Sequence, residues 1–220
     1  MIVAVFSDVH ANALALDVFL AQVEGKVDAY LCLGDSVNYG PWNDECLERI
    51  LGLPNITMLE GNHERLFRGD DEVSDEIPLV RAFFDASHAS FRRTDLIDGL
   101  PTSCELGPFL CVHTIDDRRI FADTDVEVAR DHLIGHSHHQ FLVTRNGYTI
   151  ANPGSVGQNR NRIDHVDYAL YDTERSTFSF ASVPYDAGRF IADLESRAYP
   201  RICIEYYERK LAQARSVRTS

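Results

Sequence analysis

The sequence contains no apolar run that approaches the length of a membrane span, and strand-like sequence begins at Ile2, where a secretion signal would place basic and then apolar residues. Its five cysteines are odd in number, far apart and never arranged as Cys-x-x-Cys. This spacing is not that of a disulfide framework, and it argues against a zinc site made of thiolates. We therefore expect a cytoplasmic protein without a membrane segment, whose cysteines are reduced and mostly buried.

Positive charge is scarce: 21 Lys and Arg stand against 34 Asp and Glu, and the formal net charge is −13. Such a surface repels nucleic acids and anionic membranes, so we expect neither as the main partner. The sequence also lacks internal repeats and low-complexity segments. Its 220 residues and 45% hydrophobic fraction suit one domain with a real core. We expect this domain to be a monomer or a homodimer.

Strands and helices alternate in the N-terminal part of the chain. Apolar runs predict strands at Ile2–Phe6, Asp28–Leu33 and Ile56–Leu59. A helix with Asn12 as its N-cap follows the first strand, and a second helix spans Asn43–Leu51. This β-α-β-α-β order predicts right-handed crossovers and a parallel sheet.

The middle of the chain has the pattern of a small helical cap, and the rest is rich in predicted strands. Pro78 suits the first position of a helix that reaches about Arg92, within a cap insertion at residues 64–100. Polar residues after Ala214 are expected to fray. The remaining predictions are strands at 103–106, 109–113, 132–135, 141–144, 148–151, 167–171 and 177–183, and helices at Asp123–Arg130, 188–196 and 204–214.

Polar side chains follow several apolar runs at the point where each run ends, which is where ligands bind in open α/β sheets. Carboxylate, amide and imidazole side chains together suit borderline divalent metals of the first transition row. The candidates are Asp8, His10, Asp35, Asn62, His113, His136 and His138. Seven ligands are too many for one tetrahedral ion and suit two ions that share a carboxylate, for which Asp35 is the central candidate.

Five sequence blocks contain these candidates: Asp8-Val9-His10, Gly34-Asp35, Gly61-Asn62-His63-Glu64, His113 and Gly135-His136-Ser137-His138. In this order they resemble the five blocks of the calcineurin-like metallophosphoesterase superfamily. The segments Ser7–Asn12 and Asn152–Gln158 are similar to the small prokaryotic phosphodiesterases of that superfamily. The resemblance spans Ile2 to Gly157 and implies an α/β fold, a four-layer α/β/β/α sandwich.

The resemblance also implies a role for each residue. Two divalent ions, with Mn²⁺ expected before Fe, Co, Ni or Zn, would activate a bridging hydroxide for attack on phosphorus. His63 would act as the general acid for the leaving group. The implied ligands are Asp8, His10 and His138 for the first ion, Asn62, His113 and His136 for the second, and Asp35 between them.

Two basic groups that hold phosphate in the protein-phosphatase branch are missing. That branch has Arg before Gly-Asn-His and Asp-Arg-Gly after Gly-Asp, whereas this sequence has Glu60 and Asn38-Tyr39-Gly40. We therefore favour a small phosphorylated substrate, a phosphodiester before a phosphomonoester, over a phosphoprotein. Arg160 and Arg162, after the Pro-Gly-Ser loop, are candidates for binding the substrate phosphate.

Other functions of the same fold stay open. A dinucleoside polyphosphate hydrolase shares the chemistry and differs in the pocket, which the cap is expected to shape. The superfamily also contains a retromer subunit whose degenerate site serves protein binding, so a scaffold is a further alternative. The complete set of candidate ligands and His63 favour an enzyme. Of the histidines outside the blocks, we expect His88 and His132 to pack in the core, His139 to lie at the rim of the site, and His165 to lie at the surface.

Overall fold

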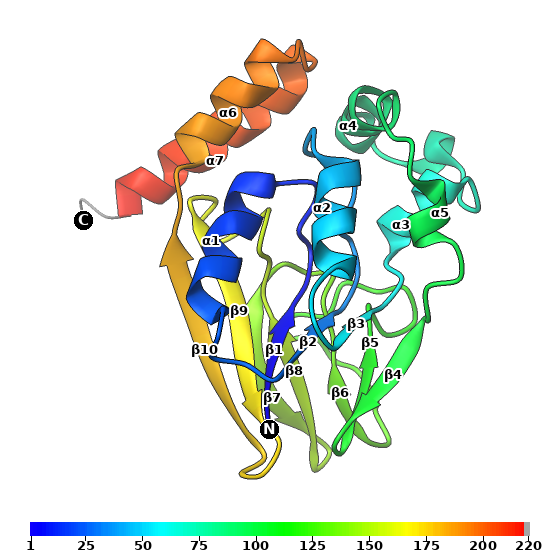
Figure 1. The fold of residues 1–220 in the computed structure, drawn as a ribbon, viewed down its shortest axis with the longest axis vertical. Helices are drawn as coiled ribbons and strands as arrows, with labels where there is room; N and C mark the ends of the chain where they lie inside the picture. The colour runs from blue at the N-terminus through cyan, green and yellow to red at the C-terminus, as the bar shows by residue number, and fades with distance from the viewer. Residues whose placement is uncertain (218–220) are drawn as a thin grey trace.

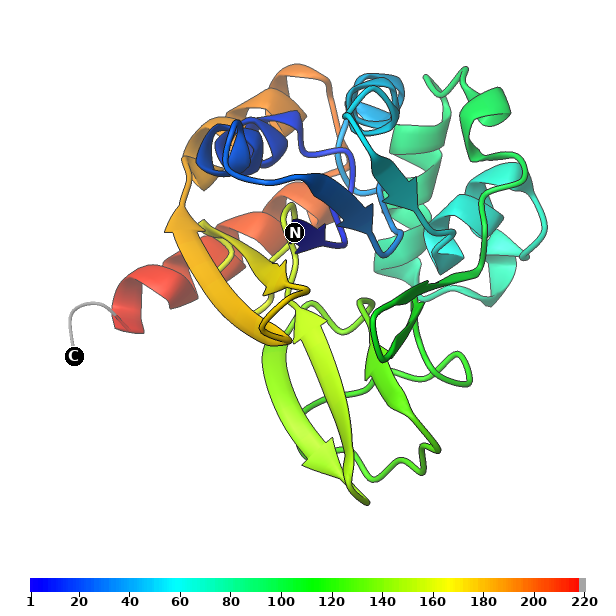
Figure 2. The same ribbon diagram turned by 60° about the horizontal axis from the view of Figure 1, so that its bottom comes forward.

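The structure, a computed structural model, describes residues 1–217, apart from the side chains of Asp75 and Val217. Two five-stranded sheets pack face to face, with helices over the first (Figures 1 and 2). This arrangement confirms the predicted α/β sandwich of two sheets. The first sheet has the order β10 (Thr177–Pro184), β9 (His165–Asp172), β1 (Ile2–Phe6), β2 (Ala29–Cys32) and β3 (Ile56–Met58). The second has the order β4 (Ser103–Leu106), β5 (Phe109–Val112), β6 (Asp131–Leu133), β8 (Tyr148–Pro153) and β7 (Gln140–Arg145).

The three N-terminal strands are parallel, as predicted, because β1 pairs with β2 and β2 with β3. The helices α1 (Ala13–Val23) and α2 (Asn43–Leu51) make the crossovers. The side chain of Asn12 accepts the Ala15 N–H at 3.1 Å, which confirms the predicted N-cap of α1. The carboxyl ends of parallel strands meet at one edge of a sheet, so the loops that follow β1, β2 and β3 lie together there.

Strand residues alternate between two cores. In β1, Val3 and Val5 face the second sheet, whereas Ala4 and Phe6 face the helices. Leu133 of β6 lies in the core between the sheets and is fully buried. The burial of one large apolar side chain such as Val, Leu or Phe stabilises the fold by about 1.5–3 kcal/mol.

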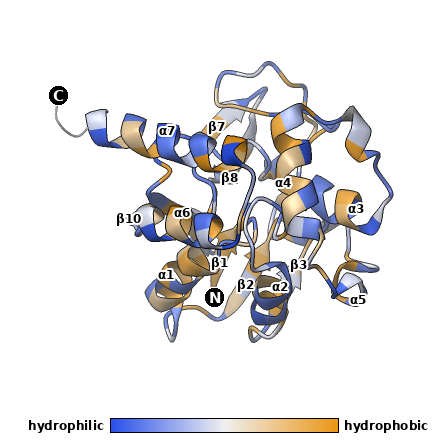
Figure 3. Ribbon diagram, turned by 90° about the horizontal axis from the view of Figure 1, so that it is seen from above, coloured by the Kyte–Doolittle hydropathy of each residue, from blue (hydrophilic) through white to orange (hydrophobic). Residues whose placement is uncertain are grey.

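Helices from two parts of the chain stand above the edge where the parallel strands end (Figures 1 and 3). They meet through Phe83 and Tyr207, whose ring centroids lie 5.8 Å apart. None of the helices in residues 1–217 is both long and apolar enough to cross a membrane. The first group is α3 (Asn62–Arg68), the 3₁₀ helix η1 (Val73–Asp75), α4 (Pro78–His88) and α5 (Thr94–Ile97), and the second is α6 (Ala187–Ser196) and α7 (Arg201–Val217).

Several predicted boundaries and one predicted position differ from the structure. Helix α4 begins at Pro78 as predicted and ends at His88, short of Arg92. Helix α7 reaches Val217, and the rest of the predicted tail, 218–220, lies outside the described residues. The surface position predicted for His165 is wrong, because this side chain is buried in β9 with Nδ1 2.7 Å from a carboxylate oxygen of Asp164.

The helix predicted at Asp123–Arg130 does not form. Residues 121–124 make a turn in which the Thr124 hydroxyl accepts the Phe121 N–H, and the chain then runs in extended form. Val126 and Val128 are two residues apart, a spacing that puts both on one face of an extended chain and not of a helix. Both pack with Ile150 against the second sheet, on the face away from the first sheet. Burial of this pair outweighs the local helical pattern.

We expect Leu133→Ala to lower the free energy of unfolding by about 2–5 kcal/mol, because it opens a cavity between the two sheets. Leu142→Ala in β7 is the matched control, since that leucine is 48% exposed. It should change the free energy of unfolding by less than about 0.5–1 kcal/mol. Urea denaturation followed by circular dichroism measures both. Equal losses in the two variants would contradict the assignment of the core.

Candidate metal centre

Five of the seven candidate ligands have a positive backbone φ angle, a conformation that residues other than glycine rarely adopt. Asp8, His10, Asp35, His136 and His138 have φ values between 49° and 63°. Positive φ at non-glycine residues is uncommon and, when clustered, marks functional sites, where surrounding structure holds the strain. Here it turns the chain sharply after β1, β2 and β6, so that these side chains point back over the sheet edge.

Two glycines allow the loops after β2 and β3 to touch. Gly34 has φ of +103°, and a Cβ there would lie 2.6 Å from the Gly61 nitrogen. A Cβ on Gly61 would in turn collide with the carboxylate of Asp35. This close approach holds Asp35 at the start of α3, where its Oδ1 accepts the His63 N–H at 2.9 Å.

The first group of candidate ligands consists of Asp8, His10 and His138, all buried. The Nδ1 atoms of His10 and His138 lie 3.0 and 2.7 Å from the carbonyl oxygens of Val37 and Gln158. A carbonyl can only accept, so each imidazole carries its proton on Nδ1. The two Nε2 atoms are therefore bare acceptors, yet they lie 3.2 Å apart. Asp8 Oδ1 lies 3.3 Å from the Nε2 of His138.

The second group brings together Asn62, His113 and His136 beside Asp35. His113 donates through Nδ1 to the Leu33 carbonyl at 2.8 Å, so its Nε2 faces the site. That Nε2 lies 3.1 Å from both Asp35 Oδ2 and Asn62 Oδ1, and 3.2 Å from His136 Nδ1. Asp35 is near the first group as well, because its carboxylate and the ring nitrogens of His10 and His63 lie within 4.8 Å of one another.

The first group is a set of acceptors that face one another, whereas the second brings the oxygens of Asp35 and Asn62 against ring nitrogens of His113 and His136. Asp8 Oδ1 is buried and accepts no hydrogen bond from any residue of the described chain. Lone pairs held this close repel one another, and burial removes the water that would separate them. A divalent cation among them replaces repulsion by coordination, and this donor set fits a borderline first-row metal. The residues present therefore fit a divalent metal ion, as predicted from the sequence.

Protonation states in the absence of metal support this fit. Burial lowers the pKa of His10 and of His138, so both rings are neutral, the form that binds a metal. Burial alone would also lower the pKa of His113, but the neighbouring Asp35 carboxylate outweighs it and raises that pKa to about 9. In the metal-free protein, a proton on His113 thus takes the place of a cation beside Asp35.

His63 lies beside Asp35, with Nε2 3.9 Å from Oδ2 of that carboxylate. Its tautomer follows from Asn38, whose Oδ1 accepts the Tyr39 N–H at 2.7 Å. The amide nitrogen of Asn38 must then face the His63 Nδ1, 3.0 Å away. Because this nitrogen donates, Nδ1 of His63 accepts, and the ring carries its proton on Nε2, on the side of Asp35.

Asn38, Glu64 and Arg119 are three residues at the site to which the sequence analysis assigned no role. Glu64 is fully buried, and its carboxylate accepts the N–H groups of Asp35, Ser36 and Gly61 at 2.6–2.8 Å. It thereby joins the loop of Asp35 to the start of α3. Its position three residues after the N-cap Gly61 is that of the acidic half of a capping box, in which the side chain accepts the N-cap N–H, a local signal that the sequence contains. Asn38 and Arg119 carry no such local signal.

The two arginines predicted to bind phosphate lie in different places. Arg160 lines a small cavity over the site, together with Asp35 and His63. Arg162 is exposed and is not among the residues that line this cavity. Arg162 ends a local turn, in which the side chain of Asn159 accepts the Arg162 N–H at 2.9 Å.

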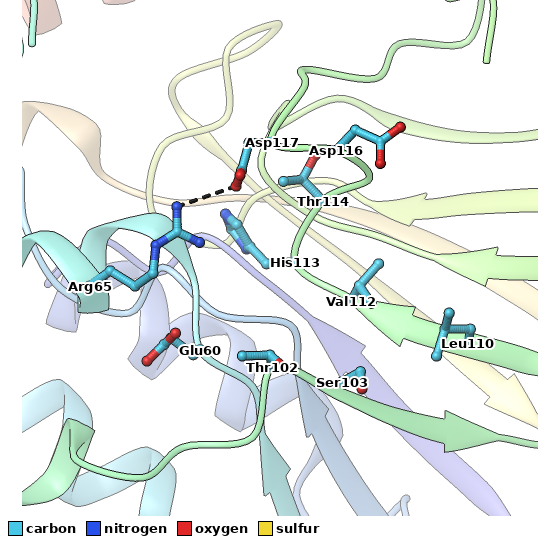
Figure 4. A pocket seen from close by; sticks show the side chains of 10 residues that line it. All are labelled: Glu60, Arg65, Thr102, Ser103, Leu110, Val112, His113, Thr114, Asp116 and Asp117. Carbon is cyan, nitrogen blue, oxygen red and sulfur yellow. Dashed lines mark hydrogen bonds and ion pairs between the residues drawn. The ribbon is translucent and has the colours of Figure 1, made fainter. Parts of the chain in front are cut away.

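The flank of the site beside His113 and His136 is acidic. Two cavities of about 380 and 390 Å³ adjoin these histidines. Arg65 lines both cavities and donates to Asp117 at 3.2 Å (Figure 4). It also donates to Asp71 at 3.0 Å, so its charge is neutralised. The acidic residues that line the two cavities are Glu60, Asp71, Glu72, Glu76, Asp116 and Asp117.

We expect metal binding to release protons, with His113 as the main source. Since its pKa is about 9, the metal-free protein holds this proton near pH 7.5, and the metal must displace it. The affinity for Mn²⁺ should rise with pH up to about 9 and fall as the pH is lowered. Calorimetry in two buffers of different ionisation enthalpy measures the released protons, and equal heats at pH 7.5 in both would contradict this assignment.

Comparison with known proteins agrees with the fold. The chain is 24% identical to an uncharacterised protein of Methanocaldococcus jannaschii over 225 aligned positions, which cover 84% of this chain and 88% of the relative. A metallophosphoesterase structure from Sphaerobacter thermophilus aligns with a TM-score of 0.74 and 26% identity, over 96% of this chain and 98% of the other. A hypothetical protein from Pyrococcus horikoshii shares the fold, with a TM-score of 0.78 and 19% identity over 94% and 97% of the two chains.

The family comparison covers most of the chain. The family model described as the calcineurin-like phosphoesterase superfamily domain matches residues 1–176. That span contains both sheets except β10, and all of the candidate ligands. The chain therefore belongs to the calcineurin-like phosphoesterase superfamily, a family of metal-dependent phosphoric ester hydrolases.

Proposed function

We propose that this protein is a dimetal phosphodiesterase for small substrates. The observation that carries the proposal is the pair of candidate ligand groups that meet at Asp35. Each group supplies enough donor atoms to bind one cation. A carboxylate shared by both groups keeps two cations close enough to act on one phosphoryl group. The proposed ligands are Asp8, His10 and His138 on one side, Asn62, His113 and His136 on the other, and Asp35 between them.

Divalent ions at these positions, with Mn²⁺ as the proposed metal, would acidify a water molecule and neutralise charge on the phosphoryl oxygens. The chain's own residues supply the rest. His63 presents its Nε2 proton on the side of Asp35 and is the proposed donor to the departing oxygen. Asn38 keeps the ring in that tautomer, and Arg160 is the proposed contact for a phosphoryl oxygen.

A diester is favoured over a phosphoprotein by the charges around the site. One flank carries the acidic residues of the two cavities beside His113 and His136, and Arg65 on that flank is already paired. A phosphoprotein substrate brings a dianionic phosphate, and its surface would cover this flank as well. A small diester carries one negative charge at the phosphorus and meets less repulsion.

The first test is hydrolysis of bis-p-nitrophenyl phosphate beside p-nitrophenyl phosphate, after treatment with EDTA and then with added Mn²⁺ or Ni²⁺. We expect EDTA to abolish turnover of the diester and added metal to restore it. Turnover of the monoester alone would replace the diesterase proposal by a phosphatase. Turnover of neither, in protein shown to hold metal, would contradict the proposed activity.

Variants at two adjoining residues separate metal binding from proton donation. His63→Ala should keep both metal ions and lower kcat about 10²–10⁴-fold on diesters with poor leaving groups. Asp35→Asn should weaken both metal sites together, because it removes the charge between the two groups. His132→Ala, in β6 away from the site, is the control. Metal analysis of the purified variants decides, and loss of metal in His63→Ala would show that His63 is structural.

A further inference from the structure

Cys104 and Cys111 lie directly opposite each other on two neighbouring antiparallel strands. The register of the hairpin pairs Cys104 of β4 with Cys111 of β5. Side chains at opposite positions of such a pair lie on the same face of the sheet, and both cysteines pack in the core between the two sheets. Hydrogen bonding from the Cys111 thiol lowers the pKa of the Cys104 thiol, so the two thiols are in contact.

The separation of the two strands suits a disulfide bond at this pair. Opposite Cα atoms of antiparallel strands lie about 4.5–5.5 Å apart, and the Cα atoms of disulfides lie about 4.4–6.8 Å apart. The Cβ atoms must approach, from about 4.5–5.5 Å to about 3.5–4.5 Å. β4 can make this small movement because it is the outer strand of the second sheet, with β5 as its strand neighbour (Figure 1). A bond that draws two strands together is strained, and strained disulfides are readily reduced.

Cys104 borders a cavity that lies away from the candidate metal centre. This cavity of about 150 Å³ is formed between β2 and β4, and Cys104 lines it together with Met1 and Ala29. Met1 and Ala29 stand at the amino ends of β1 and β2, whereas the candidate ligands of the first sheet follow the carboxyl ends. Cys104 is half-buried, and the other four cysteines are buried. A small oxidant therefore meets Cys104 before any other thiol of the chain.

Thiols that react with peroxide share three properties. They have a lowered pKa, they are accessible, and a second cysteine beside them resolves the oxidised form. Cys104 has all three properties, with Cys111 as the neighbouring cysteine. Burial raises the pKa of each of the remaining cysteines, which makes them poor nucleophiles. These are Cys32, Cys46 and Cys203.

We propose that Cys104 and Cys111 form a reversible disulfide when the protein meets hydrogen peroxide. The Cys104 thiolate attacks one oxygen of the peroxide, so that an S–O bond forms, the O–O bond breaks and hydroxide leaves. The sulfur of Cys111 then attacks that of Cys104, so that the S–S bond forms and the S–O bond breaks with loss of water. Two electrons pass from the thiols to the peroxide, and the two thiol protons end in two molecules of water. This reaction is independent of the proposed hydrolase activity.

The test is peptide mass spectrometry of the full chain after EDTA treatment, exposure to hydrogen peroxide and alkylation of the remaining thiols. EDTA removes metal that would itself react with peroxide. Trypsin leaves both cysteines in the peptide Thr94–Arg118, since no Lys or Arg lies between them. We expect this peptide to lose two hydrogen atoms and to bind no alkylating reagent, and dithiothreitol to restore both thiols. Cleavage after Glu105 should leave the two halves of the oxidised peptide joined.

Two variants and a control assign the roles of the two cysteines. Cys111→Ala should leave Cys104 as a sulfenic acid that dimedone traps, whereas Cys104→Ala should bind no dimedone. Cys203→Ala, which removes a buried thiol of α7, should form the disulfide as the wild type does. Circular dichroism confirms that each variant is folded. Two free thiols in the wild-type peptide after peroxide, or a bond from Cys104 to another cysteine, would overturn the inference and leave the phosphodiesterase proposal intact.

Discussion

The site depends on buried acceptor atoms that the fold holds against their mutual repulsion. The Nε2 atoms of His10 and His138 face each other at 3.2 Å, and Asp8 Oδ1 lies beside them without a donor. Neither ring can turn away, because each Nδ1–H donates to a main-chain carbonyl. Burial removes the water that would relieve the repulsion, so a cation is the natural partner of this arrangement. The protein is organised for that cation before it binds.

Hydrogen bonds to main-chain carbonyls hold the loops that carry these atoms in place. The Ser155 hydroxyl and the Gly157 N–H both donate to the carbonyl of Asp8, at 2.8 and 3.0 Å. The amide of Asn152 donates to the Gly135 carbonyl at 2.6 Å. Since Asp8 follows a strand of the first sheet and Gly135 a strand of the second, the end of β8 and the loop after it join both halves of the site. The centre can therefore form only when the two sheets are packed.

Charge is distributed unevenly around the candidate metal centre of this acidic protein. Acidic side chains and the paired Arg65 surround one flank, whereas Arg119, Arg160 and Lys210 stand without carboxylate partners in the described part of the chain on the other. Net charge alone predicts repulsion of anions. Local charge decides the direction from which an anion approaches, because fields near a low-dielectric cleft are dominated by the nearest groups.

The sequence by itself determined the parallel order of the first three strands, the bounds of α2 and the identity of the candidate ligands. These depend on short-range signals: apolar runs, an N-cap, and blocks that follow strand ends. Only the tertiary structure decided that Asn38 sets the tautomer of His63. It also decided that Arg119 lines the cavity over the candidate metal centre and that Arg162 does not. It also replaced the predicted helix at Asp123–Arg130 with an extended segment. Each of these outcomes depends on contacts between residues far apart in the chain, whose burial and charge outweigh local propensity.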